Sequence, residues 1–148
     1  MKIKKVIPSI ILIVTVLGVI LSVIEVTEVK GASMEPLIQE GQIVYSVITP
    51  SFKEGEIVIA NTENQSVIKR IYAVSGDNIE ITEQNVLVNG ELVKVLESVV
   101  PDIKTTLGEG EYLLLGDNPG TSYIITDKVR SRVEVIADAN DALFSIWR

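Results

Sequence analysis

The spacing of apolar residues divides the chain into two parts. From Val6 to Ile24, 19 consecutive residues carry no charge, and no polar stripe runs along them. Beyond about residue 30, apolar residues alternate with polar ones or form short runs that end at Asn, Asp or Gly, which is the pattern of β-strands. We expect strands at residues 42–47, 56–60, 66–74, 78–82, 85–89, 91–93, 111–115, 133–137 and 142–147. Residues 94–110 show little pattern and are expected to form a loop or a small excursion.

The uncharged run predicts a membrane anchor. As a helix, 19 residues extend about 28 Å, close to the thickness of a bilayer core of about 30 Å. A helix buried in a soluble core usually has a polar stripe, and a cleaved signal peptide usually has a shorter apolar region. Basic residues precede the run and acidic residues follow it, which places the N-terminus in the cytoplasm. The run is bordered by Lys2, Lys4 and Lys5 on one side and by Glu25 and Glu28 on the other.

These observations predict three regions. Residues 1–5 form a cytoplasmic N-terminus, residues 6–25 a single transmembrane anchor, and residues 26–148 an extracytoplasmic β domain. Many short strands separated by turn residues favour a sandwich or barrel. The expected fold class is therefore mostly β, with one transmembrane helix ahead of one all-β domain in the cell membrane.

Composition narrows the possible chemistry. The chain has 148 residues and contains neither Cys nor His, so a disulfide framework, a thiol nucleophile and a Ser-His-Asp triad are all excluded. With 13 Lys and Arg against 20 Asp and Glu, the net charge is −7, which argues against a nucleic-acid partner. No metal or other cofactor is expected. Hydrolytic chemistry would have to use Ser, Thr, Lys, Asp, Glu or Tyr.

Two segments supply such groups. Ser33 lies in Gly31-Ala32-Ser33-Met34-Glu35-Pro36-Leu37, which either exposes a hydroxyl on a sharp turn or is a linker leaving the membrane. Lys69 lies in a predicted strand between two β-branched neighbours on the same face, Val67 and Ile71. Desolvation there would lower its pKa and yield a neutral amine, a base for a serine hydroxyl. The alternative is an exposed edge lysine that prevents aggregation.

A third segment, Gly116-Asp117-Asn118-Pro119-Gly120-Thr121-Ser122, is either a β-turn or a loop that presents amide and hydroxyl groups. Together the segments resemble, in order, the conserved boxes of bacterial type I signal peptidases, the membrane-anchored Ser-Lys proteases of protein export. Residues 31–37 resemble the nucleophile box G-x-S-M-x-P-T-L without its Thr. Residues 55–59 resemble G-D-I-V-V, residues 69–77 resemble K-R-V-x-x-x-P-G-D, and Gly116-Asp117-Asn118 with Ser122 resembles G-D-N-x-x-x-S-x-D-S-R.

The resemblance implies a role for each matching residue. Ser33 would be the nucleophile, Lys69 the general base, and Ser122 the group that orients the lysine amine. The Ser33 N–H would be one oxyanion donor, the second donor stays unassigned, and Met34 would line a shallow pocket for a small side chain. The implied substrates are exported preproteins with signal peptides, and the short 77–112 interval resembles the small Gram-positive members.

The last box departs from the family pattern. Ile124 and Thr126 occupy positions where the family has an acidic residue and an arginine, and only an insertion would let Asp127 with Arg130 or Arg132 replace them.

Four functions follow from these patterns. The leading hypothesis is a Ser-Lys endopeptidase that removes signal peptides. The second is a non-catalytic or narrowly specialised relative that assists assembly of surface proteins, which the altered last box favours. The third is a self-cleaving repressor, which the membrane segment and the negative charge disfavour. The fourth is an anchored β-domain that binds a partner, in which Ser33 and Lys69 would be dispensable.

Overall fold

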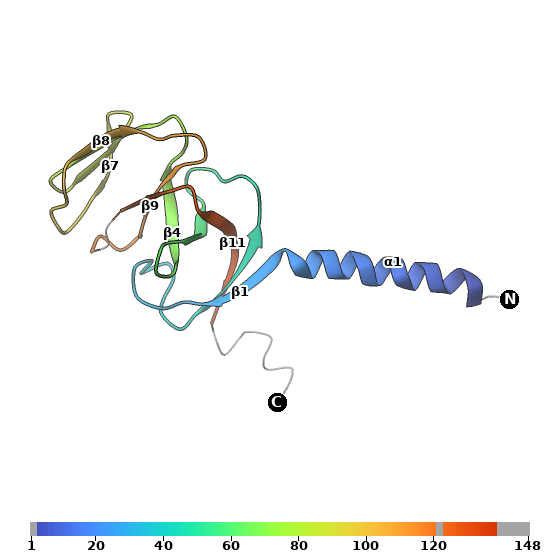
Figure 1. Ribbon diagram of the computed structural model, residues 1–148. Helices are drawn as coiled ribbons and strands as arrows, with labels where there is room; N and C mark the ends of the chain where they lie inside the picture. The colour runs from blue at the N-terminus through green and yellow to red at the C-terminus, as the bar shows by residue number, and fades with distance from the viewer. Residues whose placement is uncertain (1–2, 121–122, 139–148) are drawn as a thin grey trace.

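The structure, a computed structural model, describes residues 3–120 and 123–138. This part of the chain contains one helix and eleven strands (Figure 1). The helix is α1 (Ile3–Ser22). The strands are β1 (Ile24–Glu28), β2 (Ile43–Ile48), β3 (Ile57–Asn61), β4 (Ser66–Ala73), β5 (Asn78–Thr82), β6 (Asn85–Val88), β7 (Glu91–Val95), β8 (Ile103–Thr106), β9 (Tyr112–Leu115), β10 (Ile124–Thr126) and β11 (Val129–Ala137). The expectation of a mostly β chain is confirmed.

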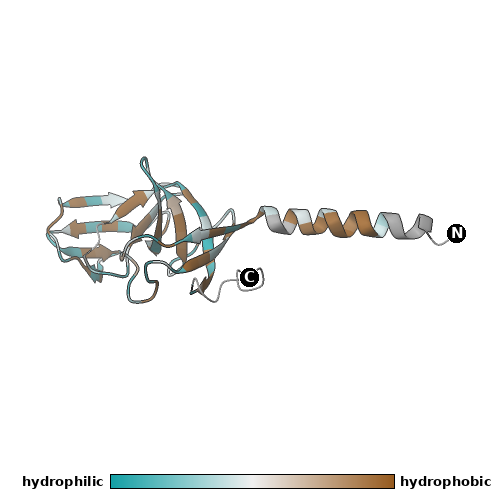
Figure 2. Cartoon of the chain, turned by 90° about the horizontal axis from the view of Figure 1, so that it is seen from below, coloured by the Kyte–Doolittle hydropathy of each residue, from teal (hydrophilic) through white to brown (hydrophobic). Residues whose placement is uncertain are grey.

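Helix α1 projects away from the β body, and its middle is strongly apolar (Figures 1 and 2). Its apolar side chains from Ile10 to Val19 are 50–66% exposed. The helix ends at Ser22 and β1 begins at Ile24, so the end of the predicted segment 6–25 is already strand. Among the residues that the structure describes, no helix combines the length and apolar character needed to cross a membrane.

The strands form two antiparallel sheets. The large sheet has seven strands in the order β1-β2-β11-β3-β4-β9-β10, and the small sheet has four in the order β7-β6-β5-β8. The chain leaves the large sheet after β4, builds the small sheet, and returns in β9, which pairs with β4. The small sheet is thus an insertion between two neighbouring strands, and it lies beside the last loop of the site described below.

The turn that leaves β4 explains the Gly-Asp pair of its sequence box. Gly76 has a φ of +91°, a backbone conformation that favours glycine. The Asp77 carboxylate accepts hydrogen bonds from the Val74 N–H and from the Asn89 side chain, both at 2.8 Å. This turn fixes the direction in which the chain enters the small sheet.

Separate apolar clusters hold the two sheets and the Ser33 segment in place. One cluster joins the ends of β4 and β9 to the small sheet, and its buried members are Ala73, Ile79, Ile81, Val86, Val88, Leu96, Leu107, Leu113 and Leu115. A second joins the segment after β1 to the large sheet and contains Val29, Met34, Ile38, Val44 and Ile59. Burial of a Met side chain contributes about 1.5–3 kcal/mol, so Met34 anchors its segment strongly.

Most predicted strands are present, with shifts of one or two residues at their ends. Residues 94–110 were expected to form a loop or a small excursion, and the loop reading is wrong in part, because β8 lies within them and pairs with β5. Strands β1 and β10 were not predicted, and β11 begins four residues before the predicted 133–137. The predicted strand 142–147 lies outside the described residues.

Candidate active site

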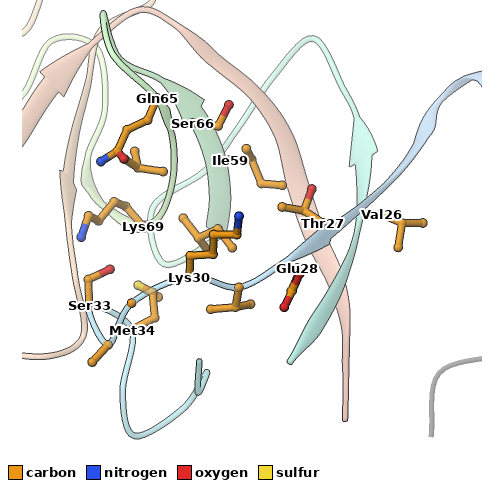
Figure 3. Close-up of a pocket in the computed structure, with 15 residues that line it drawn as sticks. Val26, Thr27, Glu28, Lys30, Ser33, Met34, Ile59, Gln65, Ser66 and Lys69 are labelled. Carbon is orange, nitrogen blue, oxygen red and sulfur yellow. The ribbon is translucent and has the colours of Figure 1, made fainter. Parts of the chain in front are cut away.

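A groove of about 770 Å³ contains three of the four residues singled out from the sequence. One wall is residues 26–34, the end of β1 and the segment that follows it. The other wall is Ile59 of β3 with residues 65–69 at the start of β4. Ser33 and Met34 come from the first wall and Lys69 comes from the second (Figure 3). Two parts of the chain that lie 36 residues apart therefore meet at one open cavity.

A tight turn presents Ser33 at the end of the first wall. The Glu35 N–H donates to the Ala32 carbonyl at 3.1 Å, and the Ile38 N–H donates to the Met34 carbonyl at 2.9 Å. Met34 is 2% exposed and packs in the core while also lining the groove. Because its neighbour is fixed in the core, half-buried Ser33 is held at the groove edge.

Lys69 lies in the middle of β4, opposite the fully buried Val58 of β3. The residue is only 7% exposed, which is rare for lysine. Burial lowers the pKa of its amine from the ordinary value of 10.5, and the positive charge of Lys94 lowers the same pKa further. A buried amine with a lowered pKa has the property that a general base needs near neutral pH.

Figure 3 shows the side chain of Lys69 extending toward Ser33 from the opposite wall. Within residues 3–120 and 123–138, no hydrogen bond joins the Ser33 Oγ and the Lys69 Nζ. Catalytic hydrogen bonds are often long before a substrate binds, so the shared groove is the relevant observation. The pair offers a hydroxyl nucleophile and a desolvated base on facing walls.

The loop after β9 connects both walls. The Asn118 N–H donates to the Ser33 carbonyl at 3.1 Å, and the Asn118 side-chain amide donates to the Ala32 carbonyl at 3.1 Å. Asp117 accepts two hydrogen bonds from the Arg70 guanidinium, at 2.8 and 2.7 Å. Since Arg70 follows Lys69 in β4, two adjacent loop residues fix the Ser33 segment and the strand of Lys69 relative to each other.

Sequence reasoning included Arg70, Asp117 and Asn118 in the conserved boxes but gave them no role. Arg70 and Asp117 carry opposite charges and lie in two boxes that the family pattern brings together. That pairing of charges was the sequence signal that could have identified them. Lys94 was missed altogether. Its ammonium donates to the Gly116 carbonyl and, at 3.0 Å, to the Asp117 carbonyl, although it comes from β7 of the small sheet. No local pattern around Lys94 distinguishes it from an exposed strand lysine.

The structure describes the last box except for residues 121–122. Ser122 lies outside the described residues. Ile124 and Thr126 are half-buried in β10, whose Ile124 pairs with Leu114 of β9 and whose Thr126 pairs with Tyr112. Asp127, the proposed substitute for the family's acidic residue, is exposed in the turn between β10 and β11.

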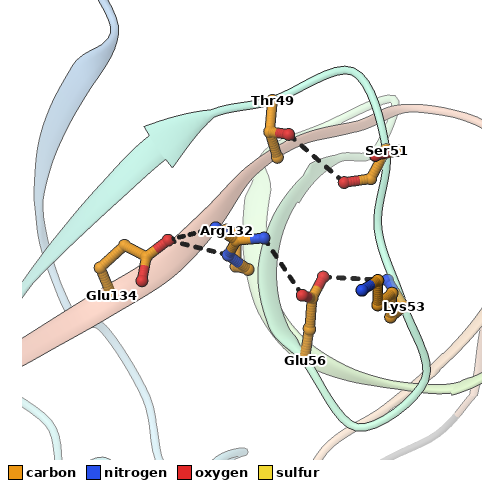
Figure 4. A network of polar contacts seen from close by, with 6 residues as sticks. All are labelled: Thr49, Ser51, Lys53, Glu56, Arg132 and Glu134. Carbon is orange, nitrogen blue, oxygen red and sulfur yellow. Dashed lines mark hydrogen bonds and ion pairs between the residues drawn. The ribbon is translucent and has the colours of Figure 1, made fainter. Parts of the chain in front are cut away.

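The two candidate arginines of β11 have other partners. Arg130 Nε lies 3.0 Å from a carboxylate oxygen of Glu25 in β1. Arg132 donates to Glu134 at 2.8 and 2.6 Å and to Glu56 at 3.2 Å (Figure 4). The second Glu56 oxygen accepts the Lys53 N–H at 2.9 Å. In the described part of the chain these arginines therefore tie β11 to β1 and to the start of β3, and neither pairs with Asp127.

Known proteins resemble this chain over much of its length. Signal peptidase I of Bacillus amyloliquefaciens is 31% identical over 93 residues, which cover 60% of this chain and 49% of the relative. Signal peptidase I of Bacillus licheniformis is 29% identical over 110 residues, covering 61% of this chain and 59% of the relative. Probable signal peptidase I-2 of Synechocystis is 27% identical over 127 residues, covering 75% and 58%.

The chain thus spans about half to three fifths of the length of these curated relatives. Residues 3–123 match the family described as signal peptidase, peptidase S26. The matched region includes α1, both walls of the groove, the small sheet and the loop after β9. The chain belongs to the signal peptidase family, peptidase S26.

Proposed function

We propose that this chain is a membrane-anchored serine endopeptidase that cleaves signal peptides from exported preproteins with a Ser33–Lys69 dyad. The observation that carries the proposal is the presence of the Ser33 hydroxyl and the buried Lys69 amine on facing walls of one groove. Membership in the peptidase S26 family and similarity to proteins named signal peptidase I support the same reaction.

The proposed mechanism is acyl transfer in two steps. Neutral Lys69 accepts the proton of the Ser33 hydroxyl while the oxygen attacks the scissile carbonyl carbon. The Ser33 N–H donates to the developing oxyanion. The Lys69 ammonium then gives its proton to the departing amine as the peptide bond breaks. In the second step Lys69 accepts a proton from water as the water oxygen attacks the acyl carbon. The bond between the Ser33 Oγ and the acyl carbon then breaks, the Lys69 ammonium returns its proton to the Oγ, and the carboxyl product leaves.

The groove is suited to an extended peptide. It runs between two stretches of chain, and Met34 forms part of its floor beside Ser33. Met34 is fixed in the core and gives the groove an apolar surface beside Ser33, which suits a small apolar side chain next to the cleaved bond. We therefore include Met34 in the substrate pocket, and we leave the role of Ser122 as implied by the family pattern.

The proposal includes anchoring by the N-terminal segment. The uncharged run Val6–Ile24, with three lysines before it, supports a single-pass anchor whose N-terminus is cytoplasmic. The exposed apolar side chains of α1 support the same placement, because water is a poor solvent for such a surface. An anchor would hold the groove near the membrane face where signal peptides end, and proximity raises the effective substrate concentration.

Cleavage of a precursor tests the proposed reaction. The full chain in membranes is incubated with a secreted precursor that has an Ala-x-Ala cleavage site, beside the variants Ser33→Ala and Lys69→Met. Two exposed residues of the same types outside the groove provide controls, Ser51→Ala and Lys104→Met. We expect cleavage by the parent and by both control variants, and none by the Ser33 and Lys69 variants. Cleavage by Ser33→Ala would refute the proposal.

The placement of the last-box residues favours one alternative, a non-catalytic or narrowly specialised factor for assembly of surface proteins. Arg130 and Arg132 pair with Glu25, Glu56 and Glu134 rather than with an acidic residue beside Lys69. If a folded parent cleaves no precursor, this alternative replaces the peptidase proposal. If it cleaves only a few precursors out of a broad panel, the specialised form applies.

A further inference from the structure

Lys94 departs from the usual behaviour of a lysine on an edge strand. It belongs to β7, which lies at the edge of the small sheet, where lysines normally extend into solvent. Here the side chain is half-buried, and its Nζ lies 5.6 Å from the centre of the Tyr72 ring in β4. The ammonium donates to two consecutive carbonyls of the large-sheet loop, those of Gly116 and Asp117. Lys94 therefore crosses from the inserted sheet to the loop that connects the walls of the groove.

The loop that Lys94 contacts determines the position of Ser33. Asn118 donates two hydrogen bonds to the backbone of the nucleophile segment, at the Ser33 and Ala32 carbonyls. On the other side of the loop, the Asp117 carboxylate binds Arg70, the neighbour of Lys69. A second contact with the small sheet lies just beyond, where the Glu97 N–H donates to the Pro119 carbonyl at 3.0 Å.

We propose that Lys94 is a positioning residue of the candidate site, because its ammonium fixes the Gly116–Asn118 loop and that loop fixes Ser33 relative to Lys69. The proposal rests on the proposed function, since it gives the small sheet a part in the same reaction. It also gives a chemical reason for the insertion between β4 and β9.

Lys94 has a second effect through its charge. Its positive charge helps to lower the pKa of Lys69, as the second largest cause after burial of the amine. Burial lowers the pKa of Lys94, the Asp117 carboxylate opposes that shift, and the Arg70 guanidinium adds to it; the Tyr72 ring also faces the Lys94 ammonium. Both hydrogen-bond partners of the Lys94 Nζ are carbonyl oxygens, which accept and cannot donate, so Lys94 serves as a donor to the loop and not as the base.

Two substitutions separate position from charge. Lys94→Met keeps the length of the side chain but removes both the charge and the donors. Lys94→Arg keeps the charge and the capacity to donate to carbonyls. Lys104→Met is the matched control, because Lys104 lies in β8 of the same small sheet and its ammonium pairs with exposed Glu80. A thermal unfolding curve for each variant reports whether it is folded.

Precursor cleavage by the full chain in membranes gives the first readout. Lys94→Met is expected to lower kcat about tenfold, which corresponds to the loss of one charge-assisted hydrogen bond. The acid limb of the pH–rate profile for cleavage by Lys94→Met should move to higher pH, since the pKa of Lys69 rises when a neighbouring positive charge is removed. Lys94→Arg should keep the acid limb of the parent, and Lys104→Met should keep both quantities.

Hydrogen exchange gives a readout that needs no activity. Peptides covering residues 112–120 and 30–36 are followed by mass spectrometry in the parent, Lys94→Met and Lys104→Met. We expect faster exchange in both peptides for Lys94→Met alone, because the Asn118 N–H bond to Ser33 loosens.

The two readouts separate this inference from the proposed function. If the parent fails to cleave any precursor, the proposed function fails, and the exchange measurement decides the role of Lys94. Parental kcat and acid limb in Lys94→Met, or parental exchange in both peptides, would overturn the proposal. Should Lys94→Met not fold, a displaced acid limb in folded Lys94→Arg would overturn it as well.

Discussion

The ion pair between Arg70 and Asp117 gives the sharpest energetic prediction. It joins β4, next to Lys69, to the loop that contacts Ser33. The guanidinium makes two hydrogen bonds to the carboxylate, at 2.8 and 2.7 Å, and donates a third at 2.8 Å to the Gly55 carbonyl. The hydrogen bond to Asp117 is the main reason why the pKa of Arg70 is raised.

The exposed fractions of the two side chains set the expected magnitude. Arg70 is 26% exposed and Asp117 16%, so the pair lies between a surface pair and a buried one. Surface pairs contribute about 0–1 kcal/mol, whereas breaking a buried pair costs about 3–5 kcal/mol. We therefore expect Arg70→Met or Asp117→Asn alone to cost about 2–3 kcal/mol of unfolding free energy. The double variant should cost less than the sum of the single variants, by about 2 kcal/mol.

The assay is urea unfolding of the full chain in detergent, followed by circular dichroism, for the parent, both single variants and the double variant. The control cycle uses Lys104 and Glu80, which pair at a similar distance of 2.8 Å but are 80% and 46% exposed. Its coupling should be below about 0.5 kcal/mol. Additive costs for Arg70 and Asp117 would refute the reasoning that burial makes this pair strong.

Three further predictions concern single residues. Lys69→Met should increase stability by roughly 1 kcal/mol, because burial at that site disfavours the charged form that lysine has in the unfolded chain. The pKa of Lys69 is lowered on folding, so the gain should shrink as pH rises from that lowered value toward 10.5, and a pH-independent gain in urea unfolding would contradict this. Met34→Ala should cost about 2–5 kcal/mol in the same assay, since the side chain is 2% exposed in the core, and a cost below 1 kcal/mol would show that the segment is not anchored there. Asn118→Ala should lower kcat about tenfold with little change in KM, because Ser33 loses part of its support, and an unchanged kcat in precursor cleavage would remove the loop from the site.

The sequence predicted the strands that carry their own apolar signal. Strands β3, β5, β6 and β9 alternate or are mostly apolar, and they lie within a residue or two of the expected positions. Strand β8 has a single aliphatic residue in Ile103-Lys104-Thr105-Thr106, so only its pairing with β5 identifies it. Strand β1 continues directly from the apolar run, and its Ile24 and Val26 are exposed, which conceals the change from helix to strand.

The site residues, like the strands, could be predicted only where the signal lies in the local sequence. Ser33 and Lys69 could be found because the order and spacing of the four boxes are specific, although neither segment is specific by itself. The contribution of Lys94 depends on how the small sheet folds back over the loop after β9, and no local pattern encodes that approach. The pairing of Arg132 with Glu56 likewise arises from the tertiary contact between β11 and the start of β3.

The central claim is that Ser33 and Lys69 act together as nucleophile and base, and acylation of Ser33 tests it most directly. The full chain in detergent is treated with an activated ester of an Ala-x-Ala tripeptide at several pH values, and the site of modification is mapped by mass spectrometry. We predict an acyl group on Ser33 in the parent, formed faster as pH rises through the lowered pKa of Lys69, and none on Ser33 in Lys69→Met. Acylation of Ser33 at the parental rate in Lys69→Met, or an unmodified Ser33 in the parent, would contradict the account.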